Sequence, residues 1–213
     1  RAGIATLAFL VLAACGGGDS ANVVTPAGTT QNVVVTGAVT GFGSVYVNGV
    51  RFDTSSATIT QDGSRVTQSA LHVGQIVHLK GRVDSSGRAS ADSIFQDDDL
   101  EGPITAIDAA AQTFVVLAHT VRVTPETSFD DSLGNFAALT VGRQVEVNGM
   151  PNASGDIVAT RIEAREPGET RLEVQGRIAT LDTVARKFTI GNLVVDYSGA
   201  TLRDFDGTAI ANG

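Results

Sequence analysis

Histidine and serine side chains are the first groups in this sequence that could do chemistry, as metal ligands or as nucleophiles. The three histidines are His72, His78 and His119, and none has a cysteine or carboxylate at the spacing of a metal site. Serine is plentiful, but no G-x-S-x-G segment is present to form a nucleophile elbow. We therefore expect three surface histidines, no catalytic residue, no metal and no cofactor.

Carboxylates occur in two arrangements with possible chemistry. Asp108 and Asp182 occupy matching places in two repeated segments, and a pair of carboxylates can hydrolyse a glycosidic bond. Each lies where a strand enters a turn, so we favour turn capping. Residues 97–101, DDDLE, place four carboxylates in five positions, but the alternating D-x-D-x-D-G spacing of a calcium loop is absent. A solvated linker is the better interpretation.

A glycine-rich segment, TGAVTGFG, contains Gly37, Gly41 and Gly43. Its G-x-x-x-G-x-G spacing differs from the dinucleotide-binding pattern, and no helix follows to receive a phosphate. We expect these glycines to break the opening strand at bulges or barrel corners.

The first 15 residues, RAGIATLAFLVLAAC, have the layout of a signal peptide, with one basic residue before an apolar run too short to span a membrane. Leu12-Ala13-Ala14-Cys15 resembles the bacterial lipobox. This resemblance implies cleavage before Cys15, acylation of Cys15 and anchoring in the membrane by lipid chains. The alternative is a buried strand or helix with a free cysteine. Gly16, in place of Asp, implies the outer membrane by the sorting pattern of such lipoproteins.

Composition limits the remaining functions. Residues 16–32 are a Gly/Ser/Thr/Pro segment without periodicity, which predicts a flexible tether. The formal charge is −8, and the basic residues do not cluster, which argues against a nucleic-acid partner. A single cysteine excludes an intrachain disulfide.

The chain uses one segment twice, at residues 71–94 and 139–162. The two copies align without a gap at an offset of 68, with nine of 24 positions identical. In each copy apolar residues alternate with polar ones, as in Val77, Leu79 and in Val145, Val147. This period of two predicts strands with one face in a core and the other in water. The three-residue spacing of Ala91 and Ile94, repeated in the second copy, predicts a bulge.

Three repeats follow from this pattern: residues 33–96, 100–165 and a truncated copy at 172–213. In the first, Asn48-Gly49 predicts a type I′ hairpin that pairs Val47 with Val50 and Val45 with Phe52. In the second, 113–116 and 120–123 form the equivalent hairpin. The third has Gly191-Asn192 at its hairpin turn and stops before any L-x-x-G-x-x-V strand. We expect it to be poorly closed, with unpaired edges.

The combined pattern resembles a bacterial family known as domain of unknown function 5666. The similarity is carried by FGSVYVNGV at 42–50, LHVG at 71–74, LEGPI at 100–104, LTVG at 139–142 and ATRI at 159–162. It implies tandem β-rich repeats on secreted or lipid-anchored proteins and transfers no catalytic residue. Short strands with glycine at the corners also resemble a small OB-like barrel. The expected fold is all-β: tandem small antiparallel OB-like barrels, two complete and one truncated.

Two functions remain open. The first is a non-catalytic envelope lipoprotein whose barrels bind an envelope protein or glycan, with Tyr46, Phe42 and Phe136 as possible contacts. The second is a hydrolase that acts on envelope polysaccharide or peptide. Fold alone does not choose between them.

Overall fold

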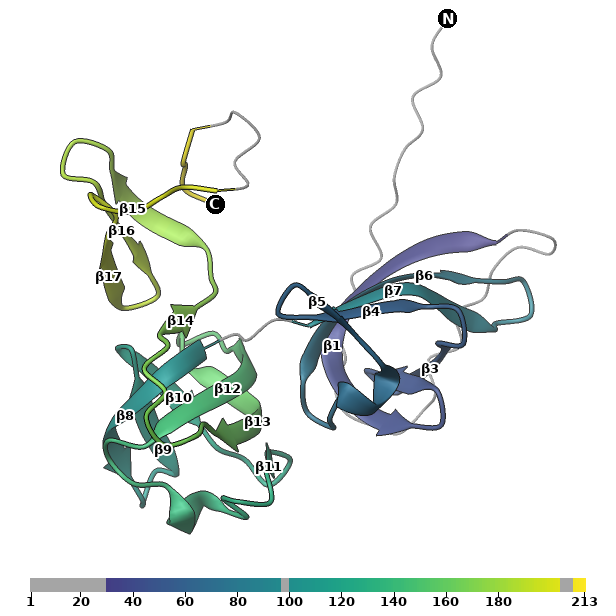
Figure 1. Ribbon diagram of the computed structural model, residues 1–213, viewed down its shortest axis with the longest axis horizontal. Coiled ribbons are helices and arrows are strands. Elements are labelled where there is room, and N and C mark those ends of the chain that lie inside the picture. Colours follow the sequence, from purple (N-terminus) through teal and green to yellow (C-terminus); the bar gives the residue numbers. More distant parts are fainter. Residues whose placement is uncertain (1–29, 97–99, 204–208) are drawn as a thin grey trace, which may run out of the picture.

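The computed structural model describes residues 30–96, 100–203 and 209–213. Two β-barrels and one small sheet follow each other along the chain (Figure 1). Among the described residues, no helix is long and apolar enough to cross a membrane. The predicted signal peptide, Cys15 and the tether up to residue 29 lie outside the described residues.

Repeat 1 contains seven strands and one 3-10 turn. They are β1 (Gln31–Phe42), β2 (Val45–Val47), β3 (Val50–Asp53), β4 (Thr58–Gln61), β5 (Ser64–Val66), η1 (Gln68–Ala70), β6 (Ile76–Val83) and β7 (Ala89–Gln96).

Five of these strands close into a barrel. The sheet order is β3-β2-β1-β6-β7-β4-β5, and a further parallel pairing of β3 with β7 completes the ring. The β4–β5 hairpin adds to the free edge of β7. A five-stranded ring in which β1 pairs with both β2 and β6 is the OB-like arrangement expected from the sequence.

Repeat 2 rebuilds the same barrel. Its elements are β8 (Leu100–Asp108), β9 (Thr113–Val116), β10 (His119–Arg122), β11 (Ser128–Phe129), η2 (Phe136–Ala138), β12 (Gln144–Pro151) and β13 (Ile157–Ala164). The order is β10-β9-β8-β12-β13-β11, with a parallel pairing of β10 and β13 as the closing contact. The repeat predicted from the 68-residue offset is therefore a repeat of three-dimensional structure.

The predicted alternation is confirmed for the core. Val77, Leu79, Val145 and Val147 are all fully buried, each inside its own barrel. Burial of this apolar stripe is the main favourable contribution to the free energy of folding of each small barrel. In repeat 1 the intervening residues of β6 are exposed, as predicted.

In repeat 2 the prediction for the outer face is wrong. Glu146 and Asn148 alternate with the core valines, yet they are 2% and 0% exposed. Glu101, which the sequence placed in a solvated linker, is 1% exposed and belongs to β8. The reason is tertiary: other parts of the chain cover this face of the second barrel and are described below.

The predicted turns and bulges are confirmed. Asn48 and Gly49 both have positive φ, and the β2–β3 register pairs Val47 with Val50 and Val45 with Phe52. The ladder between β6 and β7 shifts register at Lys80/Gly81, so one extra residue is accommodated between Ala91 and Ile94. Both side chains can then point into the core.

Three details differ from the sequence expectation. Strand β1 begins at Gln31, two residues before the expected start of repeat 1. The bulge expected among these glycines is present between Val39 and Gly41, but β1 continues through Gly37 and Gly41 without the expected break. Strand β10 begins at His119, one residue earlier than predicted, since the hairpin turn has only two residues.

Repeat 3 is a three-stranded sheet of β15 (Ile178–Asp182), β16 (Lys187–Ile190) and β17 (Leu193–Asp196). None of the described residues from 172 onward is buried, which agrees with the prediction of a poorly closed unit. A short strand, β14 (Glu173–Val174), precedes this sheet and pairs with the beginning of β8 in repeat 2.

A loop of repeat 1 packs against repeat 2. The Ser128 hydroxyl donates to the Val73 carbonyl at 2.9 Å, and the Thr160 hydroxyl donates to the Gly74 carbonyl at 2.5 Å. A methyl group on Gly74 would lie 2.4 Å from both the Ser128 hydroxyl and the Thr160 carbonyl. Glycine is therefore required at position 74 by the approach of the second barrel as well as by its φ of 92°.

This contact between the two barrels, which we call the joint (Val73, Gly74, Ser128 and Thr160), continues to the buried face of repeat 2. The Ile76 amide donates to the side-chain oxygen of Asn148 at 3.0 Å, and both groups are buried. The two barrels are thus connected by hydrogen bonds that water cannot easily replace.

Candidate functional site

The structure separates the three histidines. His72 and His78 are exposed, as predicted. His119 is 6% exposed, so the prediction that it is a surface residue is wrong. Its Nδ1 lies 2.8 Å from the Leu117 carbonyl, and a methyl group on Gly191 of repeat 3 would meet its Nε2 at 2.6 Å. His119 is buried because the turn of repeat 3 lies against it.

Asp108 and Asp182 each cap a turn. The Asp108 carboxylate accepts hydrogen bonds from the amides of Ala110 and Ala111, both at 3.0 Å. The Asp182 carboxylate accepts from the amides of Val184 and Ala185 at 2.9 and 2.8 Å. The turn-capping interpretation is confirmed, and the two carboxylates lie in different repeats. Among residues 30–96, 100–203 and 209–213, no group of three His, Cys, Asp or Glu side chains is arranged to hold a metal ion.

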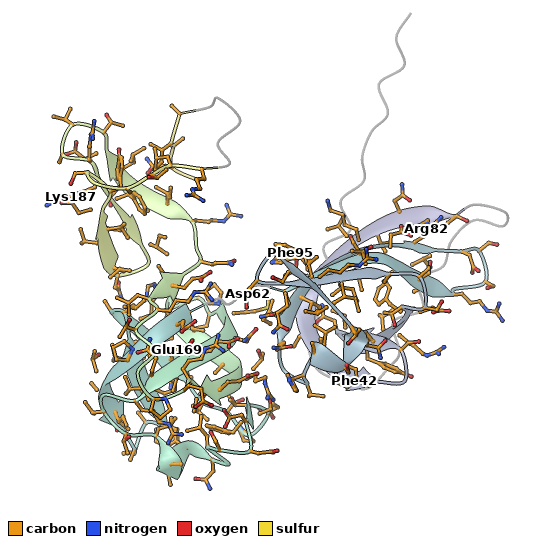
Figure 2. The ribbon with its side chains drawn as sticks, viewed as in Figure 1. Phe42, Asp62, Arg82, Phe95, Glu169 and Lys187 are labelled. Carbon is orange, nitrogen blue, oxygen red and sulfur yellow. The ribbon has the colours of Figure 1, made fainter. Side chains whose placement is uncertain are left out.

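The three aromatic residues named as possible contacts lie in different places. Phe42 ends β1 and is 42% exposed, and Figure 2 shows it on the side of repeat 1 away from Arg82. Tyr46 on β2 is half-buried and lies directly opposite Arg51 of β3.

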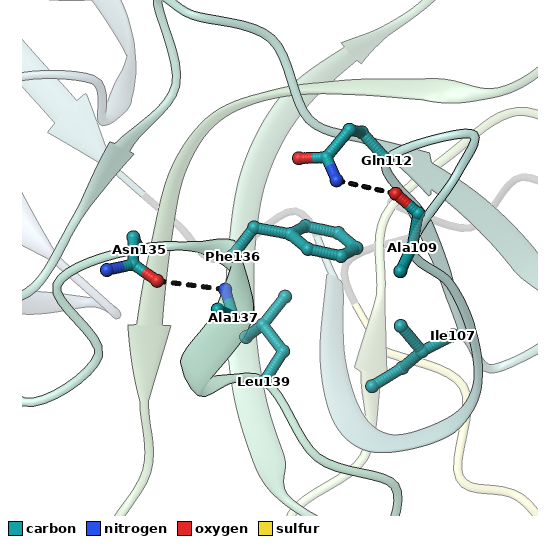
Figure 3. Close-up of a pocket in the computed structure, with 7 residues that line it drawn as sticks. All are labelled: Ile107, Ala109, Gln112, Asn135, Phe136, Ala137 and Leu139. Carbon is teal, nitrogen blue, oxygen red and sulfur yellow. Dashed lines mark hydrogen bonds between the residues drawn. The ribbon is translucent and has the colours of Figure 1, made fainter.

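Phe136 lines a shallow apolar hollow on repeat 2. Its ring faces the turn between β8 and β9, where the Gln112 amide donates to the Ala109 carbonyl at 2.7 Å (Figure 3). The hollow is lined by Ile107, Ala109, Gln112, Asn135, Phe136, Ala137 and Leu139. It holds no ionisable side chain, so it offers contact surface without reactive chemistry.

A second hollow, on repeat 1, is polar. It lies where β3 meets β7 and where the β6–β7 turn begins, which in OB-like barrels is near the loops that bind oligosaccharides or oligonucleotides. We call it the seam hollow. Its lining is Thr30, Arg51, Asp53, Arg82, Asp84, Gly87, Arg88, Ala89 and Ser90.

Two of its three guanidinium groups already have partners. Arg51 donates to the Gly43 carbonyl at 3.1 and 3.3 Å, which holds its side chain along the β1–β2 turn. Arg82 forms an ion pair with Asp92 at 2.6 Å on the barrel surface. For Arg88, no ion pair or side-chain hydrogen bond connects it to another described residue.

The two carboxylates of the hollow stay ionised over a wide pH range. A hydrogen bond from the Ser55 amide lowers the pKa of Asp53 below its ordinary value. Hydrogen bonds from the Ser86 hydroxyl and the Arg88 amide lower the pKa of Asp84. Both carboxylates therefore act as hydrogen-bond acceptors, not as proton donors, near neutral pH.

The same seam in repeat 2 carries reversed charges. The register pairs Asp53 with Ser90 in repeat 1 and Arg122 with Val158 in repeat 2, so Asp53 corresponds to Arg122. Arg88 corresponds to Asp156 at the 68-residue offset. In repeat 2 these two positions form an ion pair at 2.8 Å. In the described part of repeat 1, no ion pair joins Asp53 to Arg88, and the seam is open.

Sequence reasoning missed this pair. A signal was present, because the gapless alignment of the two copies sets a positive residue against a negative one at 88 and 156. The partner positions, 53 and 122, lie outside the aligned segment, and only the parallel pairing of β3 with β7 and of β10 with β13 brings them together.

Repeat 2 has a buried polar group of its own, which we call the carboxylate network: Glu101, Glu146, Asn148 and Arg165. Arg165 lies 2.6 Å from Glu146 and 3.3 Å from Glu101, and the side-chain nitrogen of Asn148 donates to Glu146 at 2.9 Å. Asn148 connects the network to repeat 1 through the Ile76 amide, and Arg171 of the following linker lies 3.9 Å from Glu101.

The fold and these surfaces define a class: a tandem OB-like barrel protein whose described parts carry surface hollows and no metal cluster. The model of a domain of unknown function (DUF5666) matches residues 34–94 and 101–163, which are the two barrels. The chain belongs to this family. No curated protein and no solved structure matches the chain.

Proposed function

We propose that this chain is a non-catalytic, lipid-anchored protein of the cell envelope whose barrels bind an envelope glycan or protein. Cys15 would carry the lipid, with the outer membrane as the site of attachment. The tether up to the first barrel would hold the binding surface away from the membrane.

The observation that carries the proposal is the open seam hollow of repeat 1. Its ionised carboxylates and its guanidinium groups lie at the surface on strands and a tight turn, which suits binding. Neither carboxylate has the raised pKa that a general acid needs, which favours binding over hydrolysis.

Chemical cross-linking on intact cells tests the proposal. The full chain, with its own leader, should capture one major envelope component, and Cys15→Ser should release the protein from the membrane fraction. A Cys15→Ser variant that stays membrane-bound would contradict the anchor. Turnover of a labelled envelope glycan or peptide by the purified chain would contradict the non-catalytic part of the proposal.

A further inference from the structure

We propose that the seam hollow of repeat 1 binds a neutral saccharide, with Asp53 accepting from its hydroxyl groups and Arg88 donating to them. This inference rests on the proposed function and names the ligand class of its binding site. The two residues come from opposite sides of the parallel β3–β7 seam and both line the hollow.

The first argument is the balance of charge. Arg51, Arg82 and Arg88 bring three positive charges to the hollow, and Asp53 and Asp84 bring two negative ones. Asp92 lies outside the lining and balances the charge of Arg82 through an ion pair at 2.6 Å. An anionic ligand would meet no net positive potential here, and the chain as a whole carries −8. An uncharged ligand with many hydrogen-bonding groups suits this site better.

The second argument is the geometry of the groups. A carboxylate and a guanidinium are planar and each presents two adjacent hydrogen-bonding atoms. Neighbouring hydroxyl groups of a sugar ring offer donors and acceptors at matching spacing. One oxygen of Asp53 is held by the Ser55 amide at 2.9 Å, which fixes the orientation of the carboxylate.

The third argument is the comparison with repeat 2. There the equivalent side chains, Arg122 and Asp156, satisfy each other at 2.8 Å. Repeat 1 has the same charges on exchanged strands, and among its described residues the pair is not closed. Asp53 interacts with the charge of Arg51, and Arg88 interacts with the charge of Asp84. Neither interaction closes the seam, so both groups line the hollow, where a ligand can meet them.

The test measures binding of defined sugars to the full chain by isothermal titration calorimetry. The probes are the neutral hexasaccharides maltohexaose, mannohexaose and chitohexaose, with an acidic galacturonate hexamer for comparison. At least one neutral hexasaccharide should bind, and Arg88→Ala should weaken it at least tenfold. Arg65→Ala is the matched control, because Arg65 is an exposed arginine of the same repeat on β5, outside the hollow. It should bind like the unmodified chain.

A charge-reversed variant separates binding from folding. Asp53→Arg combined with Arg88→Asp copies the closed pair of repeat 2, so the melting temperature should not fall while saccharide binding is lost. Binding that survives this double substitution, binding by none of the neutral probes, or binding by galacturonate alone would each overturn the inference.

The same double variant keeps this inference distinct from the proposed function. If it still captures the envelope component in the cross-linking experiment, the envelope role stands and the seam hollow is not its site. If the unmodified chain captures nothing, the proposed function itself fails.

Discussion

Repeats 1 and 2 have the same barrel, but repeat 1 exposes polar side chains at positions where repeat 2 buries them. Repeat 1 exposes His78 and Lys80 on the outer face of β6, and it leaves the Asp53–Arg88 seam open. Repeat 2 buries the equivalent Glu146 and Asn148 and closes the equivalent seam with an ion pair. Two copies of one fold thus differ in their outer faces: repeat 1 leaves these polar positions exposed, whereas repeat 2 uses them for contacts with the rest of the chain.

The first strands of the two repeats show where repeat 2 gains an extra strand. The registers with β6 and β12 make Val35 and Thr36 the equivalents of Leu100 and Glu101. In repeat 2, β14 pairs alongside Leu100 and Glu101. In repeat 1 the side-chain amide nitrogen of Asn48 donates to the Thr36 carbonyl at 3.1 Å, at the position equivalent to the one where β14 pairs in repeat 2.

At that turn, repeat 2 has Leu117 in place of Asn48, and an apolar side chain cannot donate such a bond. Repeat 1, with Asn48 at the turn, caps this strand edge with a side-chain amide. Repeat 2, with Leu117 at the turn, extends the sheet with β14. An amide that satisfies the edge also protects it from pairing with another chain.

The largest effect is expected from removing Arg165. Arg165→Ala removes the cation that lies 2.6 Å from the buried Glu146 and 3.3 Å from the buried Glu101. Glu101 keeps Arg171, at 3.9 Å. The free energy of unfolding of repeat 2 should fall by about 3–5 kcal/mol, as when one partner of a buried ion pair is removed. His78→Ala, at the exposed position equivalent to Glu146, should change it by less than about 0.5 kcal/mol. Urea unfolding of both variants checks the contrast, and equal effects would contradict it.

The joint is tested by two equivalent glycines. Gly74 and Gly142 have φ of 92° and 88°, so alanine at either should cost about 1–3 kcal/mol in backbone strain. At Gly74 the added methyl group also meets Ser128 and Thr160 of the other barrel, whereas nothing lies within 4 Å at Gly142. Only Gly74→Ala should loosen the joint. Small-angle scattering should show a larger radius of gyration for that variant alone, and the same increase with Gly142→Ala would refute the assignment.

Asp130 makes the stability of repeat 2 depend on pH, whereas the equivalent position in repeat 1 is Thr60, which does not ionise. Burial by itself would raise the pKa of Asp130, but hydrogen bonds from the Ala164 and Leu133 amides and from Ser132 lower it below its ordinary value of 3.8. A lowered pKa in the folded state means that the ionised carboxylate stabilises the barrel above pH 3.8. This contribution is lost as the pH falls through the lowered pKa.

We expect Asp130→Asn to lower the free energy of unfolding by about 1.5 kcal/mol near neutral pH, the size of a hydrogen bond to a charged group. The difference from the unmodified chain should shrink once the pH drops below 3.8. Denaturant titrations at pH 7 and at pH 3 measure it, and a difference that grows in acid would show that the sign is wrong.

The smallest effect concerns the two hairpin turns. Ala118 occupies the turn position of Gly49, with φ of 62° against 78°. Ala118→Gly removes the strain of a side chain at positive φ and should stabilise repeat 2 by about 0.5–1 kcal/mol, while Gly49→Ala should destabilise repeat 1 by a similar amount. Thermal unfolding should show shifts of opposite sign, and shifts in the same direction would contradict the equivalence of the turns.

The sequence by itself determined the barrel, its repetition and its turns. Alternating valine and leucine, the Asn48-Gly49 turn and the odd spacing of Ala91 and Ile94 are local patterns, and local patterns fix which face of a strand is apolar and where the register shifts. The structure has these features because each depends on residues that are neighbours along the chain or in one hairpin.

Only the tertiary structure decided which polar residues are buried and which are exposed. Glu146 and Asn148 alternate with the core in the same way as His78 and Lys80, and no local pattern distinguishes them. Asn148 accepts a hydrogen bond from Ile76 of the other barrel, and Glu146 forms an ion pair with Arg165, so both positions are buried by contacts with distant segments. In the same way, Asp53 and Arg88 form one seam only because β3 and β7 close the barrel in parallel. Burial and proximity depend on contacts between distant segments, and alternation along a strand carries no information about them.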